Sequence, residues 1–134
     1  MNRVFVDTSA ILALMVPADR FHGQAARAFE RVRQDKAMLV TTSYVLAETY
    51  ALVGRRMGVR AVRALRESFE PALEIVWVGR DLHDAGLDLL VARDERDLSV
   101  VDAVSLALLG RTPVEAVFAF DRDFDAGGFR MLAG

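Results

Sequence analysis

The sequence contains no cysteine, which excludes disulfide bonds, thiolate metal sites and cysteine nucleophiles. It also lacks a long apolar run. The N-terminal run ends at the charge of Asp7, before it reaches the about 7–15 apolar residues of a secretory signal. The longest later run, residues 10–16, is far shorter than the ~20 residues that a membrane-spanning helix needs. We therefore expect a cytoplasmic protein without a membrane segment.

Lysine, histidine and tryptophan are all scarce. Of the 17 residues that are lysine or arginine, Lys36 alone is a lysine. The two histidines, His22 and His83, have no partner at metal-ligand spacing, so we expect them to serve surface or packing roles. The single tryptophan, Trp77, falls in an apolar run and is expected in the core or at an interface.

Arginine is abundant, although the net charge of −2 argues against a general nucleic-acid-binding surface. Arginine is the better residue for bidentate contact with phosphates. Four arginines fall near one helical face if two successive helices continue without much bend: Arg56, Arg60, Arg63 and Arg66. This face is either a phosphate-contacting stripe or a solvated surface balanced by Glu67 and Glu70, and we favour the solvated surface.

Apolar patterns run almost from end to end, and they predict strands alternating with helices. The 134 residues, of which 53% are hydrophobic, form one domain that is large enough for a core. Thr8 or Ser9 is expected to cap the first helix, and Asp19 the second. The expected strands are residues 4–6, 38–41, 73–78 and 115–120, with a short fifth at 130–132. The expected helices are residues 10–16, a segment after Asp19, and residues 43–57, 59–69, 81–93 and 99–109. This order predicts a three-layer α/β/α sandwich around a parallel sheet of four to five strands.

Two acids directly follow apolar strands in this scheme. Asp7 comes after Val4-Phe5-Val6, and Asp121 comes after residues 115–120. Ligands of parallel sheets bind beyond the carboxyl ends of the strands, so both carboxylates are expected at that edge. Each also has a purely structural interpretation: Asp7 as a helix cap, and Asp121 as part of a polar turn.

Two further acids stand on expected helices. Glu48 shares a helical stripe with Tyr44 and Arg55, and it lies either at the sheet edge or on a solvated face. Asp102 lies three residues after Ser99 in a very apolar helix. Ser99 and Asp102 form a variant of the capping box, and the helix dipole favours an acid there. A carboxylate among so many apolar residues is costly unless it is paired or bound to a metal.

The alternating acids Asp121, Asp123 and Asp125 invite comparison with a calcium-binding loop. That comparison fails, because Ala126 stands where such a loop requires glycine and Leu132 where it requires glutamate.

Two other α/β folds with acidic pockets fit poorly. A HAD-type phosphatase requires a second acid two residues after Asp7, where this chain has Ser9. A response-regulator receiver requires a lysine at the end of a late strand, and Lys36 lies early in the chain.

Taken together, four acids are expected at one edge of the sheet: Asp7, Glu48, Asp102 and Asp121. Clustered carboxylates repel one another and raise each other's pKa. A hard cation such as Mg²⁺ or Mn²⁺ relieves this repulsion, because it prefers oxygen ligands. Such a site supports phosphodiester hydrolysis without a Ser, Cys or His nucleophile.

In order and spacing, these motifs resemble the PIN domain over essentially the whole chain. The resemblance is carried by four segments: residues 7–10 after the first apolar run, 46–48, 98–103 and 120–124. It is closest to the single-domain bacterial and archaeal type, the VapC-like toxins. It implies a Mg²⁺- or Mn²⁺-dependent endoribonuclease acting on an RNA substrate. The implied metal-binding quartet is Asp7, Glu48, Asp102 and Asp121, with Thr8 or Ser9 helping to hold a ligand or water and with Asp123 and Asp125 as auxiliaries.

The resemblance also implies a homodimer and, for toxins, a small antitoxin partner that blocks the site. One alternative stays open: a catalytically silent PIN-like module that only binds RNA or protein. Such a module need not bind Mn²⁺, so divalent-metal binding distinguishes the two.

Overall fold

The computed structural model describes residues 2–132, without the side chains of residues 125 and 126. Within this range the chain forms a four-stranded sheet in which every pairing is parallel, with the order β3-β2-β1-β4. The strands are β1 (Arg3–Val6), β2 (Met38–Thr42), β3 (Leu73–Val76) and β4 (Ala116–Phe118). Strands β1, β2 and β4 bury nearly all of their side chains, whereas β3 is only partly buried along its length.

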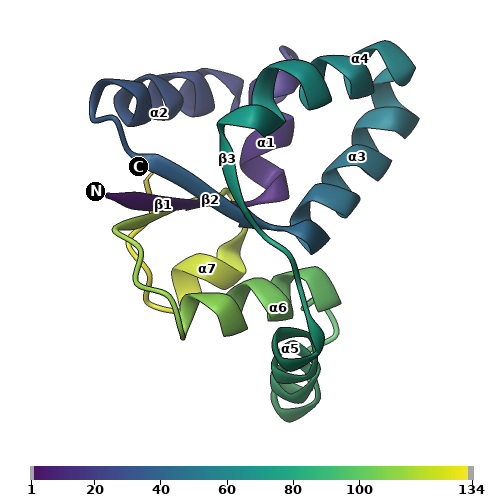
Figure 1. The fold of residues 1–134 in the computed structure, drawn as a ribbon, viewed down its shortest axis with the longest axis vertical. Helices are drawn as coiled ribbons and strands as arrows, with labels where there is room; N and C mark the ends of the chain where they lie inside the picture. The colour runs from purple at the N-terminus through teal and green to yellow at the C-terminus, as the bar shows by residue number, and fades with distance from the viewer. Residues whose placement is uncertain (1, 133–134) are drawn as a thin grey trace.

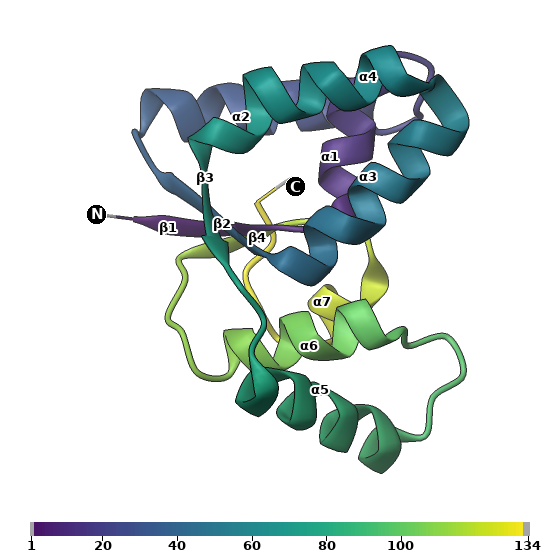
Figure 2. The same cartoon turned by 45° about the vertical axis from the view of Figure 1, so that its right-hand side comes forward.

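Helices cover both faces of the sheet, which confirms the three-layer α/β/α prediction (Figure 1). In the described residues the helices are α1 (Thr8–Met15), α2 (His22–Gln34), α3 (Ser43–Met57), α4 (Val59–Ala64), α5 (Arg80–Arg93), α6 (Val100–Leu109) and α7 (Arg122–Ala126). The first four helices lie on one face, and α5, α6 and α7 lie on the other (Figures 1 and 2). None of the described helices is long and apolar enough to cross a membrane.

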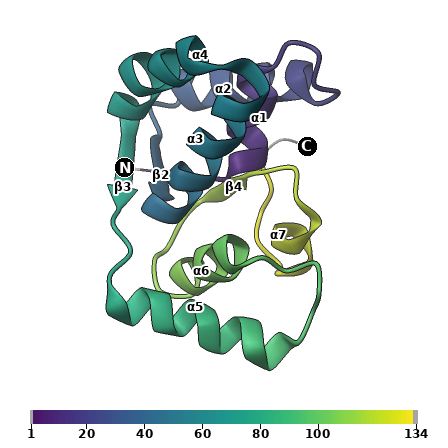
Figure 3. The same cartoon turned by 90° about the vertical axis from the view of Figure 1, so that its right-hand side faces the viewer.

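Helix α6 lies between the sheet and α5, and this position explains why it is apolar on almost every side (Figure 3). Its contact with α5 is unusually close, because Gly86 of α5 lies against Val104 of α6. A Cβ atom at Gly86 would lie 2.9 Å from the Val104 Cα atom. The packing of α5 therefore holds α6, and the start of α6, in place against the sheet.

The helix starts differ from the expectation in two places. Asp7, not Thr8 or Ser9, is the N-cap of α1. Its backbone is extended at the end of β1, and its carboxylate accepts from the Ser9 backbone N–H. Asp19 accepts from the Phe21 N–H in the turn before α2 and does not cap the helix itself. Thr42 caps α3, because its hydroxyl oxygen accepts from the Val45 N–H at 3.1 Å.

The segment expected as one helix over residues 59–69 is instead divided. Helix α4 ends at Ala64, a π-helical turn covers Leu65–Phe69, and a 3₁₀ turn covers Glu70–Ala72. Pro71 lacks an N–H and its ring clashes with the preceding turn, so the regular helical ladder cannot continue up to it. Before this segment, Gly58 ends α3 with φ +87°. Helix α4 starts at the far end of α3 and runs along the top of the molecule towards β3 (Figure 2), so the arginines expected on one continuous face lie on two helix axes.

Two strand predictions also need correction. Residues 130–132 contribute only an isolated bridge between Met131 and Val117, not a fifth strand. Trp77 lies beyond the end of β3 and is 73% exposed, so its assignment to the core is wrong. Strand β3 ends at Val76 and is only partly buried, so Trp77 lies in the connection to α5, where no layer covers it.

Candidate metal centre

Asp7 lies where β1 meets α1, at the carboxyl edge of the sheet. The three residues before it are buried in the core, and Asp7 itself is only 3% exposed. Its Oδ2 atom accepts hydrogen bonds from the Ser9 N–H at 3.3 Å and from the Ser9 hydroxyl at 2.9 Å. Its Oδ1 atom is buried and has no hydrogen-bond partner in the described residues. Asp7 therefore serves as a helix cap and keeps one carboxylate oxygen for another ligand.

Asp102 reaches the same edge from the opposite helical layer. Ser99 is the N-cap of α6, and its hydroxyl accepts from the Asp102 N–H at 3.0 Å. The expected Ser99 cap is thus confirmed, as one half of the capping-box variant. Asp102 is 8% exposed, although the start of its helix is at the sheet edge.

Asp121 comes from the loop between β4 and α7. Strand β4 ends at Phe118, so two residues separate Asp121 from the strand that was expected to lead into it directly. The loop is tied to α1, because the Phe120 N–H donates to the Ser9 hydroxyl oxygen at 2.9 Å. Asp121 accepts in turn from the Asp123 N–H at 2.9 Å. These two bonds fix the path of the loop past Asp7.

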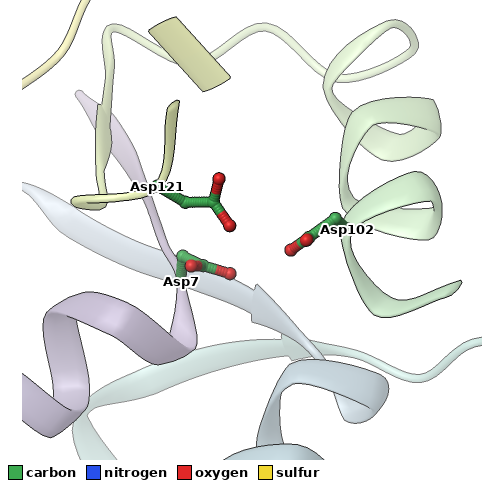
Figure 4. Close-up of side chains that lie close together, drawn as sticks. All are labelled: Asp7, Asp102 and Asp121. Carbon is green, nitrogen blue, oxygen red and sulfur yellow. The ribbon is translucent and has the colours of Figure 1, made fainter. Parts of the chain in front are cut away.

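The three aspartates converge on one point from three separate segments (Figure 4). One carboxylate oxygen from each of Asp7, Asp102 and Asp121 lies within 4.8 Å of the other two. Among the described residues, no other group of three or more acids or histidines has this geometry. The convergence joins residues 7, 102 and 121, which are far apart in the sequence but share the carboxyl edge of the sheet.

Glu48 lines the same cavity, of about 270 Å³, but its carboxylate is not part of the close group of three. Thr8 and Ser9 line it as well. The Thr8 hydroxyl, however, lies 3.1 Å from that of Thr49 and connects α1 to α3, whereas the Ser9 hydroxyl contacts the Asp7 carboxylate directly. Of the two residues expected to assist at the site, Ser9 therefore has the closer contact with an acid.

The remaining expected residues lie beside the centre or away from it. Asp123 is half-buried next to Asp121 and outside the group of three. Asp125 lies in α7, and its side chain is outside the described residues. His22 bonds to the Ala13 carbonyl, and His83 bonds to the Tyr44 hydroxyl, so both histidines are engaged elsewhere.

Two cavity residues were not anticipated from the sequence. Leu12 of α1 and Leu52 of α3 contribute apolar walls. The sequence could have predicted Leu52 as a cavity residue, since it lies one helical turn after Glu48 and shares its face. Leu12 has no comparable signal, because an apolar residue in an apolar helix is expected in any core.

Burial keeps water away from the carboxylates, so the negative charge of one raises the pKa of its neighbours. Burial and the negative charge of Asp121 raise the pKa of Asp7 from 3.8 to about 6, although the hydrogen bonds from Ser9 oppose the shift. Burial and the charges of Asp7 and Asp121 raise the pKa of Asp102 to about 7. Burial and Asp121 also raise the pKa of Asp123. Asp7 and Asp102 are thus the acids of the centre whose charged forms are disfavoured by burial and by neighbouring negative charge.

A divalent cation fits this arrangement. The donors are all carboxylate oxygens, which Mg²⁺ and Mn²⁺ prefer. The buried Oδ1 atom of Asp7 has no hydrogen-bond partner in the described residues. A buried polar atom without a partner destabilises the fold, and a bound ligand would remove that penalty. No lysine or arginine forms an ion pair with any of the three aspartates in the described residues. A cation held between the three aspartates would therefore supply the positive charge that the described residues do not.

Comparison with known proteins agrees with this geometry. Residues 4–129 match the description of the PIN domain. The chain belongs to the PIN-domain family. It is 37% identical over 127 residues to the 23S rRNA-specific endonuclease VapC20 of Mycobacterium tuberculosis, which covers 94% of this chain and 95% of VapC20. It is 29% identical to the ribonuclease VapC26 of the same organism over 120 residues, covering 89% of this chain and 87% of VapC26.

Solved structures give the same result. The crystal structure of VapC20, described as a sarcin–ricin loop cleaving toxin, superposes with a TM-score of 0.81 at 36% identity and covers 98% of this chain and 99% of that one. FitAcB from Neisseria gonorrhoeae superposes with a TM-score of 0.70 at 12% identity, over 96% of each chain, and supports the fold alone. Within the PIN-domain family, the chain is thus a ribonuclease of the VapC type.

Proposed function

We propose that this PIN domain, residues 1–134, is a Mg²⁺- or Mn²⁺-dependent endoribonuclease. Asp7, Asp102 and Asp121 hold the cation, and Glu48 assists directly or through a water molecule. The observation that supports this assignment is the convergence of three carboxylate oxygens within 4.8 Å of one another. The buried Asp7 oxygen without a partner adds to it.

The residues of the chain have separable tasks in this proposal. Ser9 orients the Asp7 carboxylate and holds the loop before Asp121 through the Phe120 N–H. The Ser99 cap fixes the first turn of α6 and with it Asp102. When bound, a divalent cation polarises the scissile phosphate, activates water and stabilises the charge that develops in the transition state. Leu12 and Leu52 restrict the access of bulk water to the acids from the side of α1 and α3.

The substrate we propose is a loop of ribosomal RNA. The relative VapC20 is named as an endonuclease specific for 23S rRNA and as a toxin that cleaves the sarcin–ricin loop. At 37% identity over nearly the whole of both chains, a related RNA loop is the best-supported substrate for this chain. We further propose that the protein acts in the cytoplasm as the toxin of a toxin–antitoxin pair. In this role it forms a homodimer, and a small antitoxin blocks the acidic centre.

Cleavage of a synthetic sarcin–ricin stem-loop by the purified protein in Mn²⁺ tests the proposal. We expect cleavage that EDTA abolishes and that Asp102→Asn reduces by at least 100-fold, since an acid that holds the cation would be lost. The matched control is Asp88→Asn, which removes an exposed acid from α5 and should cleave as the parent does. Full single-turnover cleavage by Asp102→Asn would contradict the assignment.

The names of the relatives favour an active enzyme over a catalytically silent module. Calorimetry with Mn²⁺ separates the two if the stem-loop is not cut. Binding of Mn²⁺ that Asp102→Asn weakens leaves the metal centre in place and points to another RNA. Absence of Mn²⁺ binding favours the silent module.

A further inference from the structure

Helix α3 forms one wall of the acidic cavity and then leads away from it. Glu48 and Leu52, one turn apart on this helix, both line the cavity. With about 3.6 residues per turn, the line through these two residues continues between Arg55 and Arg56 in the last turn of α3. This arginine pair lies about 11 Å beyond Glu48 along the helix axis, at a rise of about 1.5 Å per residue.

The positive charge of this pair is not compensated locally. Arg55 and Arg56 are both exposed, and neither takes part in the ion pairs of the described residues. Residues 55–66 contain five arginines and no acid, although the whole chain carries a net charge of −2. The end of α3 is therefore a region of positive potential on a protein that is otherwise weakly acidic.

The other arginines of this segment have different surroundings. Arg60 and Arg63 lie on α4, beyond the bend at Gly58, where the chain turns back across the top of the molecule (Figure 2). Arg66 lies near Tyr50, whose pKa it lowers against the effects of burial and Glu70, and the Tyr50 hydroxyl donates to Glu70. Only Arg55 and Arg56 continue the helix face that lines the cavity.

We propose that Arg55 and Arg56 bind backbone phosphates of the RNA strand whose scissile bond lies at the acidic centre. This inference rests on the proposed function, because it assumes that the cavity accepts RNA. A polyanion that approaches a cluster of carboxylates is repelled unless nearby positive groups offset the repulsion. The planar guanidinium group matches a phosphate in a bidentate manner. The pair thus sets the direction of the strand, which runs from the cavity along α3.

Two double variants with the same loss of charge test the proposal. Arg55→Gln with Arg56→Gln removes the pair on α3, and Arg60→Gln with Arg63→Gln removes two exposed arginines on α4. The probe is a fluorescently labelled sarcin–ricin stem-loop, bound in EDTA so that no cleavage occurs, and measured by anisotropy at several salt concentrations. Thermal unfolding of both variants controls for folding, and exposed arginines are expected to leave it unchanged.

We expect the α3 variant to lower the slope of log affinity against log salt by about 1.4, since each lost phosphate contact on a single strand contributes about 0.7. Binding at low salt should weaken roughly tenfold or more. The α4 variant should keep the parent slope. In Mn²⁺ the α3 variant should raise KM and leave kcat unchanged, because uniform binding is lost and the reacting groups are intact.

The other outcomes overturn the inference in distinguishable ways. Equal losses in the two variants would mean a diffuse attraction without a defined contact. An unchanged slope in the α3 variant would exclude contact at Arg55 and Arg56 while leaving the ribonuclease proposal standing. A parent protein that does not bind the stem-loop at all would contradict the proposed substrate and this contact together.

Discussion

Asp102 illustrates how a single residue can be costly to the fold and useful to a site. Its carboxylate is 8% exposed and faces two other acids, with no basic residue paired to it. Its pKa is raised to about 7, whereas the ordinary value is 3.8. The folded protein therefore binds more protons than the unfolded chain between about pH 4 and pH 7. In this window the stability of the metal-free protein falls as the pH rises.

The variant Asp102→Asn should lose much of this dependence, because it has no carboxyl group to ionise. In EDTA at about pH 7.5, we expect it to be more stable than the parent by roughly 1–3 kcal/mol. At about pH 4 the Asp102 carboxyl group is protonated in the folded parent, and the difference should nearly vanish. Thermal unfolding across this pH range measures both quantities. An asparagine variant that is less stable than the parent at neutral pH would show that Asp102 is not under electrostatic strain.

Ser9 matters for the site because its hydroxyl group contacts one acid directly and holds the loop that carries another. It donates to the Asp7 carboxylate and accepts from the Phe120 N–H, one residue before Asp121. In Ser9→Ala, the Phe120 N–H loses its partner, and we expect a loss of stability of about 1–2 kcal/mol. Because both acids are then less well oriented, Mn²⁺ affinity should fall by about 10–100-fold. Ser9→Thr, which keeps a hydroxyl, is the control, and calorimetry is the measurement. Parent-like Mn²⁺ affinity in the alanine variant would remove Ser9 from the site.

At the scale of elements, the junctions between strands and helices are what the sequence predicts best. The apolar run before Asp7 and the spacing of Ser99 and Asp102 are local signals, and both positions are confirmed. The alternation of strands and helices likewise predicts the parallel sheet, because parallel strands require crossover helices. Since parallel strands end at one edge, the meeting of Asp7 and Asp121 could be anticipated without coordinates, and the capped helix start placed Asp102 near the same edge.

The remaining differences depend on information that is not local. Trp77 was expected in the core or at an interface because its neighbours are apolar, but β3 ends at Val76 and the side chain is 73% exposed, which contradicts the core assignment alone. Glu48 lines the same cavity as the three aspartates, as expected, but its carboxylate lies outside their close group, and which helical side chains reach that group depends on packing that the sequence does not display. Similarly, the π-helical turn at Leu65–Phe69 reflects the combined demands of Pro71 and of the buried Leu65 side chain.

The contact between α5 and α6 permits a test at the scale of elements. An added Cβ atom at Gly86 would clash with the side chain of Val104 and approach its backbone, so Gly86→Ala should push α6 away from α5. We expect a loss of about 1–3 kcal/mol, which is typical of overpacking. Gly54→Ala in α3 is the matched control, because its Cβ atom would meet Val62 Cγ2 at 3.5 Å, an ordinary contact distance. Denaturant unfolding compares the two. A Gly86→Ala protein as stable as the control would mean that the helices adjust without cost.

On the scale of the whole molecule, the acidic centre lies where the two helical layers meet. Asp7 begins α1 on one face of the sheet, whereas Asp102 lies on α6 on the other face, and Asp121 follows β4 (Figures 3 and 4). A cation held by all three would connect the layers across the edge of the sheet. Without it, mutual repulsion of the carboxylates acts against the same packing.

Binding of Mn²⁺ should therefore stabilise the entire fold and not only the site. At a free concentration 100 times the dissociation constant, a ligand that binds only the folded state adds about 2.7 kcal/mol. For a domain of this size, that corresponds to a rise in Tm of roughly 10 °C. The rise should grow with pH between about 5 and 8, because the ligands must lose protons before they bind the cation. In Asp121→Asn it should be much smaller, and in Asp88→Asn, with its exposed acid, it should be retained. A rise of equal size in Asp121→Asn would place the bound ion elsewhere on the protein.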